Sequence, residues 1–369
     1  MSEVFTFFKG RVALYAILKS IGISSGDEVI LPGFTCVVVP NAIKYTGAKP
    51  VYVDINPIDY NIDVNRIEEK INAKTKVIIA QHTFGIPADM DKIRSLTKRY
   101  NIYLVEDACH VLGSRYQGVE VGLLGDAAFF SSQWSKPITT GLGGWAVIND
   151  ETLIAKMREQ YGQFISPSGK EQKLIKLQYD LYNSLMTPKI FWFAQSLYRN
   201  LSNRGLLVGS STDDELEYQM PYDYPKKMGM TQEKLLFSKL MDKDKVIAHR
   251  KKITQIYADF FPIEYDRLIK DGVDTVFLRF PLLVEDKIGI LDLAKEYKVE
   301  IGDWFLSPLH PNMTGWEKVD YEKGDCPIAE EVCKHIINLP THEKITEKEA
   351  VRIATFVKKY RGNYEYTIS

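Results

Sequence analysis

The sequence predicts an α/β fold in which a large domain with a mostly parallel sheet precedes a smaller C-terminal α+β domain. Strand and helix patterns alternate from the N-terminus to about Asp150, which is typical of a parallel sheet with helices on both faces. Residues 77–80 and 102–105 are short apolar runs rich in β-branched residues, as expected for strands buried on both sides. We assign residues 1–235 to the large domain and residues 236–369 to the small one.

A helical insertion interrupts this alternation at about residues 153–224. Within it, the aromatic-rich stretch 188–204 carries an apolar run that is too short and too interrupted to span a bilayer. An amphipathic helical pair packed on a dimer interface is the favoured interpretation, and docking to a membrane surface is the alternative. After the insertion, the patterns predict a long helix at 233–257, strands at 275–281 and 299–301, and helices at 328–334 and 346–360.

Lys136 is the most informative residue of the chain. Ser131 precedes it by five positions, glycines follow it, and Phe129, Phe130 and Trp134 make the approach to it apolar. A single lysine is usually a solvated surface charge, but a desolvated one has a depressed pKa and can hold an aldehyde cofactor as a Schiff base. With the serine as a phosphate ligand, this arrangement favours pyridoxal 5′-phosphate (PLP) as the cofactor.

Asp107 supplies a second element of such a site. It directly follows the predicted strand 102–105 and Glu106, so we expect it at the carboxyl edge of the sheet, where ligands bind in open α/β folds. A carboxylate there can pair with the protonated pyridine nitrogen of the cofactor. A helix N-cap would have the same sequence signature, but Lys136 downstream favours the cofactor role.

Gly10 and Arg11 open an amphipathic helical pattern near the N-terminus. The first turn of a helix offers unpaired N–H groups to an anion, the glycine allows close approach, and the arginine adds a fixed charge. These residues are a candidate phosphate cradle. The alternative is that they simply begin a helix packed on the sheet.

The chain resembles the DegT/DnrJ/EryC1/StrS sugar aminotransferases, which belong to the fold-type I PLP enzymes. The resemblance covers nearly the whole chain and rests on ordered segments at 26–35, 41–43, 47–54, 82–85, 106–108, 113–114, 131–144, 304–310, 327–330 and 338–340. It implies that Lys136 is the cofactor lysine, serving as nucleophile and proton shuttle, and that Asp107 pairs with the pyridine nitrogen.

The resemblance also implies the other ligands and the reaction. Ser131 and the Gly10–Arg11 turn would bind the cofactor phosphate, while His82, His310 and Trp304 would lie near the sugar. An amino acid, L-glutamate by expectation from the family, would charge the cofactor, and a keto sugar, most often nucleotide-linked, would accept the amine. We expect a homodimer with shared active sites. Family dehydratases carry histidine in place of the lysine, so Lys136 favours transamination.

Three positions near the expected cofactor depart from the family pattern. Position 110 is histidine where glutamine is usual, Cys36 stands where an aromatic residue commonly stacks on the ring, and Leu142 replaces an acidic residue. His110 is a credible substitute that could stack on the ring or hydrogen-bond to its phenolic oxygen, with a buried structural histidine as the alternative. Cys36 is more consistent with a small packing residue than with a reactive one.

A fourth departure concerns the expected contact between subunits. The family usually has an Asn-x-Arg motif that reaches the partner's cofactor phosphate, but here Pro225 takes the asparagine position. Lys226 or Lys227 could still supply a charge to that phosphate, and Lys227 is the candidate ligand.

Composition sets broad limits on function. The chain has 47 basic and 48 acidic residues, which excludes a general electrostatic attraction to nucleic acid. Its four cysteines show no CxxC spacing or metal pattern, and no signal peptide is visible, so we expect a reduced cytoplasmic protein without a metal site. Two alternatives to a sugar aminotransferase stay open: a catalytically silent descendant that binds a sugar nucleotide, and a PLP enzyme with a non-sugar amine acceptor.

Overall fold

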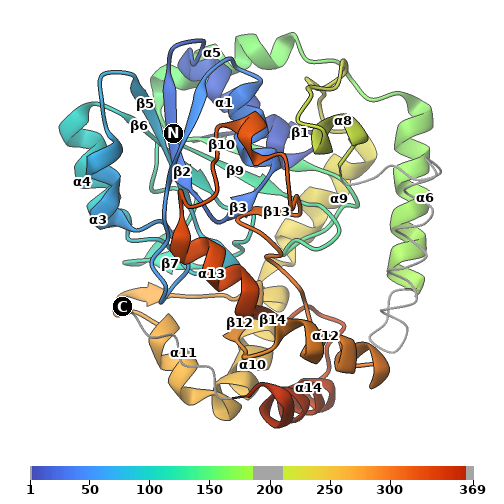
Figure 1. Ribbon diagram of the computed structural model, residues 1–369. Coiled ribbons are helices and arrows are strands. Elements are labelled where there is room, and N and C mark those ends of the chain that lie inside the picture. The colour runs from blue at the N-terminus through green and yellow to red at the C-terminus, as the bar shows by residue number, and fades with distance from the viewer. Residues whose placement is uncertain (1, 186–210, 363–369) are drawn as a thin grey trace.

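A computed structural model describes residues 2–185 and 211–362 of the chain (Figure 1). The large domain lies in the upper part of Figure 1, and the C-terminal helices α10, α11, α12 and α14 gather below it. The predicted insertion is described only in part, because the stretch 188–204 lies outside the described residues. In the described part of the chain, no helix is long and apolar enough to cross a membrane.

A seven-stranded sheet forms the centre of the large domain, in the order β1-β10-β9-β6-β5-β2-β4. Strand β10 is antiparallel to both of its neighbours, and the other pairs are parallel, which confirms the predicted mostly parallel sheet. The bounds are β1 Glu3–Phe7, β2 Glu28–Pro32, β4 Lys49–Val53, β5 Thr75–Gln81, β6 Tyr103–Asp107, β9 Ala127–Ser131 and β10 Gly144–Ile148.

Both faces of this sheet are buried under helices, as predicted. Side chains of β5 alternate between two apolar clusters: Val77 and Ile79 join one cluster, and Ile78 and Ala80 join the other. The first cluster includes residues of α1 and α2, and the second includes residues of α4. The large-domain helices are α1 Gly10–Ile21, α2 Val38–Lys44, α3 Val64–Ile67, α4 Met90–Tyr100, α5 Glu151–Gly162, α6 Gly169–Leu185 and α8 Asp213–Leu216.

The predicted helix at 233–257 is wrong as a single element. The structure has two helices, α9 Met230–Met241 and α10 Lys243–Phe260, separated at Asp242. The backbone of Asp242 leaves the helical region, with φ of −97° and ψ of 10°. Aspartate favours helix boundaries over helix interiors because its short side chain competes for backbone hydrogen bonds, and this explains the break.

The small domain is built on the antiparallel pair β12 Arg279–Leu283 and β14 Ile336–Pro340. The predicted strand 275–281 overlaps β12 only in part, because residues before it dock on the large domain: Leu278 N donates to Phe84 O at 2.8 Å. Residues 299–301 form no strand, and the nearest ladder contact is the bridge from Gly302 to Asn338. The helices here are α11 Pro262–Leu268, α12 Lys287–Glu296, α13 Pro327–His335 and α14 Glu347–Tyr360.

Short elements complete the fold. Strands β7 Arg115–Tyr116, β8 Val119–Glu120 and β11 Val273–Asp274 form a small sheet, and single 3₁₀ turns lie at Glu68–Lys70, Thr83–Gly85 and Trp316–Val319. A two-residue strand, β13 Leu309–His310, pairs in parallel with β3 Thr35–Cys36. This pairing returns the C-terminal part of the chain to the large domain beside the sheet edge.

The predicted boundary between the large and the small domain, at residues 235 and 236, stays a prediction.

Candidate active site

Several of the predicted cofactor residues lie at the carboxyl edge of the parallel strands. Asp107 is the last residue of β6 and Ser131 is the last residue of β9, and these two strands are neighbours. The β3–β13 pairing places Cys36 opposite His310. Ends of neighbouring parallel strands share one edge of a sheet, so Asp107 and Ser131 come to one place. The separate β3–β13 pair lies near this edge, because Cys36 interacts electrostatically with Cys109 and His310 with Lys136.

Asp107 is a buried carboxylate with few internal partners. Its side chain is 5% exposed, and Oδ1 accepts a hydrogen bond from Cys109 N at 3.0 Å. The alternative role as a helix N-cap does not apply, because residues 108–113 form turns and bends and no helix begins among them. Burial raises the pKa of Asp107, while the Cys109 N–H and the charge of Lys136 partly oppose that rise. The carboxylate is therefore placed to gain from a cation at this edge.

Lys136 faces an aromatic ring that comes from the C-terminal part of the chain. Its Nζ lies 4.9 Å from the centre of the Trp304 ring and makes no hydrogen bond or ion pair with a described residue. Two of the three apolar residues predicted from its own loop lie elsewhere: Phe129 is in the core, and Phe130 stacks on Trp145 at 4.7 Å. Trp304 thus supplies the apolar contact that the neighbouring residues were expected to provide.

His110 lies among aromatic rings beside this lysine. Its ring is nearly parallel to those of Phe84 and Trp304, at centroid distances of 6.3 and 5.3 Å. Its Nδ1 accepts from Phe84 N at 3.2 Å. Burial, with a further contribution from the charge of Lys136, lowers the pKa of His110 well below its ordinary value. His110 is consequently a neutral imidazole whose Nε2 carries the proton.

His310 and Trp304 join the same group of rings, at a centroid distance of 5.9 Å from each other. The Nδ1 atom of His310 accepts a hydrogen bond from Leu306 N at 3.2 Å. Burial lowers the pKa of His310 to about 4, so this ring is also neutral at physiological pH. The predicted contact of both residues with the substrate stays a prediction.

His82 does not share this arrangement. Its side chain is fully buried, Nε2 lies 3.2 Å from Glu106 Oε2, and Nδ1 accepts from Ala88 N at 3.1 Å. Both ring nitrogens are therefore used inside the protein. This geometry gives no support to the predicted role of His82 at the sugar. It is the geometry of a residue that holds neighbouring segments of the protein together.

The first turn of α1 lies against Ser131. A Cβ atom on Gly10 would come within 2.8 Å of Phe130 O and 3.0 Å of Ser131 Cβ, so this contact requires glycine. The amides of Gly10 and Arg11 have no acceptor within the helix. Together with the Ser131 hydroxyl, they form a cradle whose donors suit a phosphate group.

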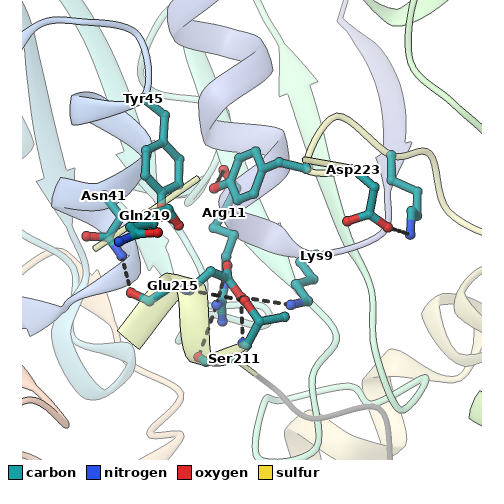
Figure 2. A network of polar contacts seen from close by, with 11 residues as sticks. Lys9, Arg11, Asn41, Tyr45, Ser211, Glu215, Gln219 and Asp223 are labelled. Carbon is teal, nitrogen blue, oxygen red and sulfur yellow. Dashed lines mark hydrogen bonds and ion pairs between the residues drawn. The ribbon is translucent and has the colours of Figure 1, made fainter. Parts of the chain in front are cut away.

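The side chain of Arg11 has a different partner from the one predicted. Its Nη1 lies 2.8 Å from Glu215 Oε1 and 3.1 Å from Ser211 Oγ, and Lys9 Nζ lies 3.0 Å from Glu215 Oε2 (Figure 2). All three ionic side chains are buried. The fixed charge expected for the cofactor phosphate is thus already paired with Glu215, and the cradle depends on backbone amides and Ser131.

Several contacts hold Glu215 in this place. It lies on the short helix α8, where Thr212 and Glu215 form a capping box, and its carbonyl accepts from Asn41 Nδ2 at 2.7 Å (Figure 2). Despite burial, Arg11 and Lys9 lower the pKa of Glu215 to about 2. The C-terminal part of the predicted insertion is therefore fixed to the start of α1 by an ionised carboxylate.

We expect Glu215→Gln to lower the free energy of unfolding by about 3 kcal/mol, because it leaves two buried cations with no counter-charge. The pKa of the folded carboxylate lies near 2, below its ordinary 4.5. Its contribution to stability is therefore complete above about pH 4.5 and is lost as the pH falls toward 2. Chemical denaturation at pH 7 and at pH 3 measures both effects.

Glu217→Gln is the matched control, since its side chain is 69% exposed and 3.2 Å from Lys318. We expect its effect to stay within about 0.5 kcal/mol at either pH. Equal stability losses for the two variants would contradict the role of the buried ion pairs.

Comparison with known proteins decides the family. The family model described as "DegT/DnrJ/EryC1/StrS aminotransferase family" matches residues 1–358. The chain belongs to this family. The resemblance noted in the sequence is confirmed, and so is the fold that it implies.

Individual relatives differ in how much of the chain they match. GDP-perosamine synthase from Escherichia coli O157:H7 is 45% identical over 158 residues, which is 43% of this chain and 43% of that enzyme. The uncharacterized protein MJ1066 from Methanocaldococcus jannaschii is 29% identical over 359 residues, covering 94% of this chain and 82% of that protein. The structure of Spr1654 from Streptococcus pneumoniae in its PMP form has a TM-score of 0.73 at 21% identity, covering 96% and 87% of the two chains.

At the position of the family's usual Asn-x-Arg motif, this chain has two lysines that contact other residues of the same chain. Lys226 Nζ is bonded to Glu171 at 2.8 Å and to Asp223. Lys227 Nζ lies 4.7 Å from the ring centre of Tyr161 on α5. Within one subunit, then, these contacts hold the two lysines outside the cradle. A contact with the phosphate in a partner subunit stays a prediction.

Two residues of this region were not found by sequence reasoning. Glu215 lies in a stretch without a strong pattern, and only the Thr212-to-Glu215 spacing of a capping box could have marked it. Arg279 begins β12 and lies with its Cζ 5.0 Å from the ring centre of Trp304. A single arginine inside an apolar strand pattern was the one signal available for it.

Proposed function

We propose that this protein is a PLP-dependent aminotransferase that moves an amino group from an amino acid, L-glutamate by expectation, to a keto sugar. The observation that carries the proposal is the meeting of Lys136, Asp107 and the α1 cradle at one sheet edge. Membership of the aminotransferase family supports the reaction class. The similarity to GDP-perosamine synthase supports a nucleotide-linked sugar. We place the product in polysaccharide or secondary-metabolite biosynthesis, as the family resemblance implies.

The residues present fit the cofactor. The amides of Gly10 and Arg11 and the Ser131 hydroxyl would bind its phosphate, and the buried Asp107 carboxylate would pair with its ring nitrogen. Lys136 has an ammonium group with no other hydrogen-bonded partner among the described residues, so it is available for the covalent bond. When bound, the cofactor supplies an electron-accepting ring that stabilises negative charge on the substrate carbon.

Each residue then has a distinct task. Asp107 keeps a proton on the ring nitrogen by its negative charge, and a cation there would lower the raised pKa of this carboxyl. Lys136 Nζ would hold the cofactor covalently and would serve as the group that takes and returns the proton of the substrate carbon. His310 and His110 are neutral at pH 7, so they add no positive charge beside Lys136.

We also propose a homodimer. Helices α6 and α9 pack on each other and leave large apolar side chains exposed, as does the segment just before α9: Leu177, Tyr222, Met230, Phe237 and Met241. Exposed apolar surface of this kind is typical of an interface. A partner packed here would also bring residues 224–229 close to its neighbour. The four cysteines are free thiols, which agrees with a cytoplasmic location.

The test is an amination assay with the purified chain, PLP, L-glutamate and a panel of GDP-, UDP- and TDP-linked keto sugars. We expect 2-oxoglutarate to form in amounts equal to an amino sugar detected by mass spectrometry, with at least one member of the panel. Glutamate conversion without any sugar turnover, but with turnover of simple keto acids or aldehydes, would contradict the sugar acceptor. Nucleotide-sugar binding without conversion of glutamate would contradict an enzymatic role.

A further inference from the structure

Arg279 is a partly buried cation at the active site that none of the roles above uses. It begins β12 of the small domain, and its Cζ lies 5.0 Å from the ring centre of Trp304. Lys136 Nζ lies 4.9 Å from the same ring centre. The positive charges of both residues contribute to the lowered pKa of His110 and of His310, after burial. Arg279 therefore belongs to the same group of side chains as the predicted cofactor lysine.

The guanidinium of Arg279 is poorly satisfied within the protein. Its Nε is buried without a hydrogen-bond partner, and Nη1 donates only a long hydrogen bond of 3.4 Å to Asn338 Oδ1. No carboxylate of the described residues forms an ion pair with it. The nearby Glu300 is bonded to His342 at 2.7 Å instead. Burial lowers the pKa of Arg279, and the charges of Glu300 and Asp303 oppose that lowering only in part, although neither carboxylate forms an ion pair with the guanidinium.

Two buried arginines show how the hydrogen-bond donors of a guanidinium are paired elsewhere in this chain. Arg11 has Glu215 as a counter-ion. Arg250 also has an unpaired Nε, but its Nη1 donates to Leu278 O at 2.9 Å and Thr341 Oγ1 at 2.7 Å. Arg279 has neither kind of short contact. A desolvated guanidinium held against an aromatic ring, with free donors, is a site for a planar anion.

The reaction itself supplies such an anion. In an α-amino acid, one carbon separates the nitrogen from the carboxylate, so a donor whose nitrogen takes the place of Lys136 Nζ brings its carboxylate close to the same ring. In a sugar nucleotide, the whole sugar ring lies between the reacting carbon and the phosphates. The position of Arg279 near Lys136 therefore favours the donor carboxylate over a nucleotide phosphate.

We propose that Arg279 binds the carboxylate of the amino donor by paired, charge-assisted hydrogen bonds, with Trp304 holding the guanidinium in place. This inference rests on the proposed aminotransferase function. It assigns the recognition of the amino donor to the guanidinium of Arg279. Arg279 is thereby a specificity-determining residue contributed by the small domain.

The test compares Arg279→Met, Arg279→Lys and the exposed control Arg267→Ala. Isothermal titration of the holoenzyme with glutarate, a dicarboxylate without an amino group, measures anion binding in the absence of chemistry. We expect Arg279→Met to weaken glutarate about 10- to 100-fold, the loss typical of a charge-assisted hydrogen bond. Arg279→Lys should weaken it less, and Arg267→Ala should leave it unchanged.

Spectral conversion of the cofactor provides a second readout. Arg279→Met should slow conversion by L-alanine by a similar factor, while conversion by ethylamine, which is alanine without its carboxylate, should be unaffected. The melting temperature of Arg279→Met should not fall, because the replacement removes a desolvated charge that forms no ion pair with a described residue.

Three results would overturn the inference: unchanged glutarate affinity, an equal loss for alanine and ethylamine, or weakened binding of GDP with glutarate unaffected. The last result would assign Arg279 to the nucleotide phosphates. Failure of the proposed function is separable, because it would appear as a wild-type chain that forms no cofactor band. The glutarate titration on the cofactor-free chain would still test Arg279 in that case.

Discussion

Replacing Lys136 with alanine is expected to lower the amino-transfer rate by more than about 10³-fold, since the variant loses both the covalent attachment of the cofactor and the group that moves the proton. The ammonium makes no hydrogen bond or ion pair with a described residue. The melting temperature of the cofactor-free variant should therefore match that of the parent chain. Single-turnover kinetics with L-glutamate and a thermal melt measure these two effects separately.

Lys156→Ala, at an exposed position on α5, is the matched control and should retain full activity. Turnover by Lys136→Ala at a rate near that of the parent chain would contradict the assignment. So would a large drop in stability without cofactor, because it would indicate a structural role for Lys136.

Asp107→Asn is the second change with a large expected effect. The amide keeps the size of the side chain and an acceptor for Cys109 N, but it removes the negative charge that keeps the ring nitrogen protonated. We expect kcat to fall about 10²- to 10⁴-fold while the protein still binds the cofactor through Lys136 and the α1 cradle. Stopped-flow absorbance with L-glutamate measures the fall.

Stability provides an independent check on Asp107. Burial raises the pKa of this carboxyl in the folded chain, so its ionised form costs stability at every pH above its ordinary pKa of 3.8. Asp107→Asn should consequently leave the cofactor-free chain at least as stable as the parent at pH 7. Asp244→Asn, at an exposed position on α10, should change neither activity nor stability. A near-normal rate for Asp107→Asn would contradict its proposed role.

The parts of the site that sequence reasoning located are those marked by local patterns. Asp107 and Ser131 end apolar strands, and Gly10 begins an amphipathic helix, so each position follows from its own neighbours. The parallel sheet then brings strand ends together without further information. This is why the fold and the sheet edge were predictable from the chain alone.

The parts that were missed depend on contacts between distant segments. The sequence shows a cation at Arg11 but not that Glu215 already neutralises it, and it shows Arg279 in a strand but not that Trp304 lies beside it. His82 shows the converse, because a motif residue can be fully buried with both ring nitrogens bonded. The break of the predicted helix at Asp242 reflects a local preference that apolar periodicity does not record.

The most direct test of the central claim is the absorption spectrum of the purified chain with PLP, before and after addition of L-glutamate. We predict a visible band from cofactor bound through Lys136, which glutamate converts to the amine form of the cofactor and 2-oxoglutarate restores. The band should be absent in Lys136→Ala. A chain that shows no visible band after reconstitution with PLP would contradict the account, whatever ligands it binds.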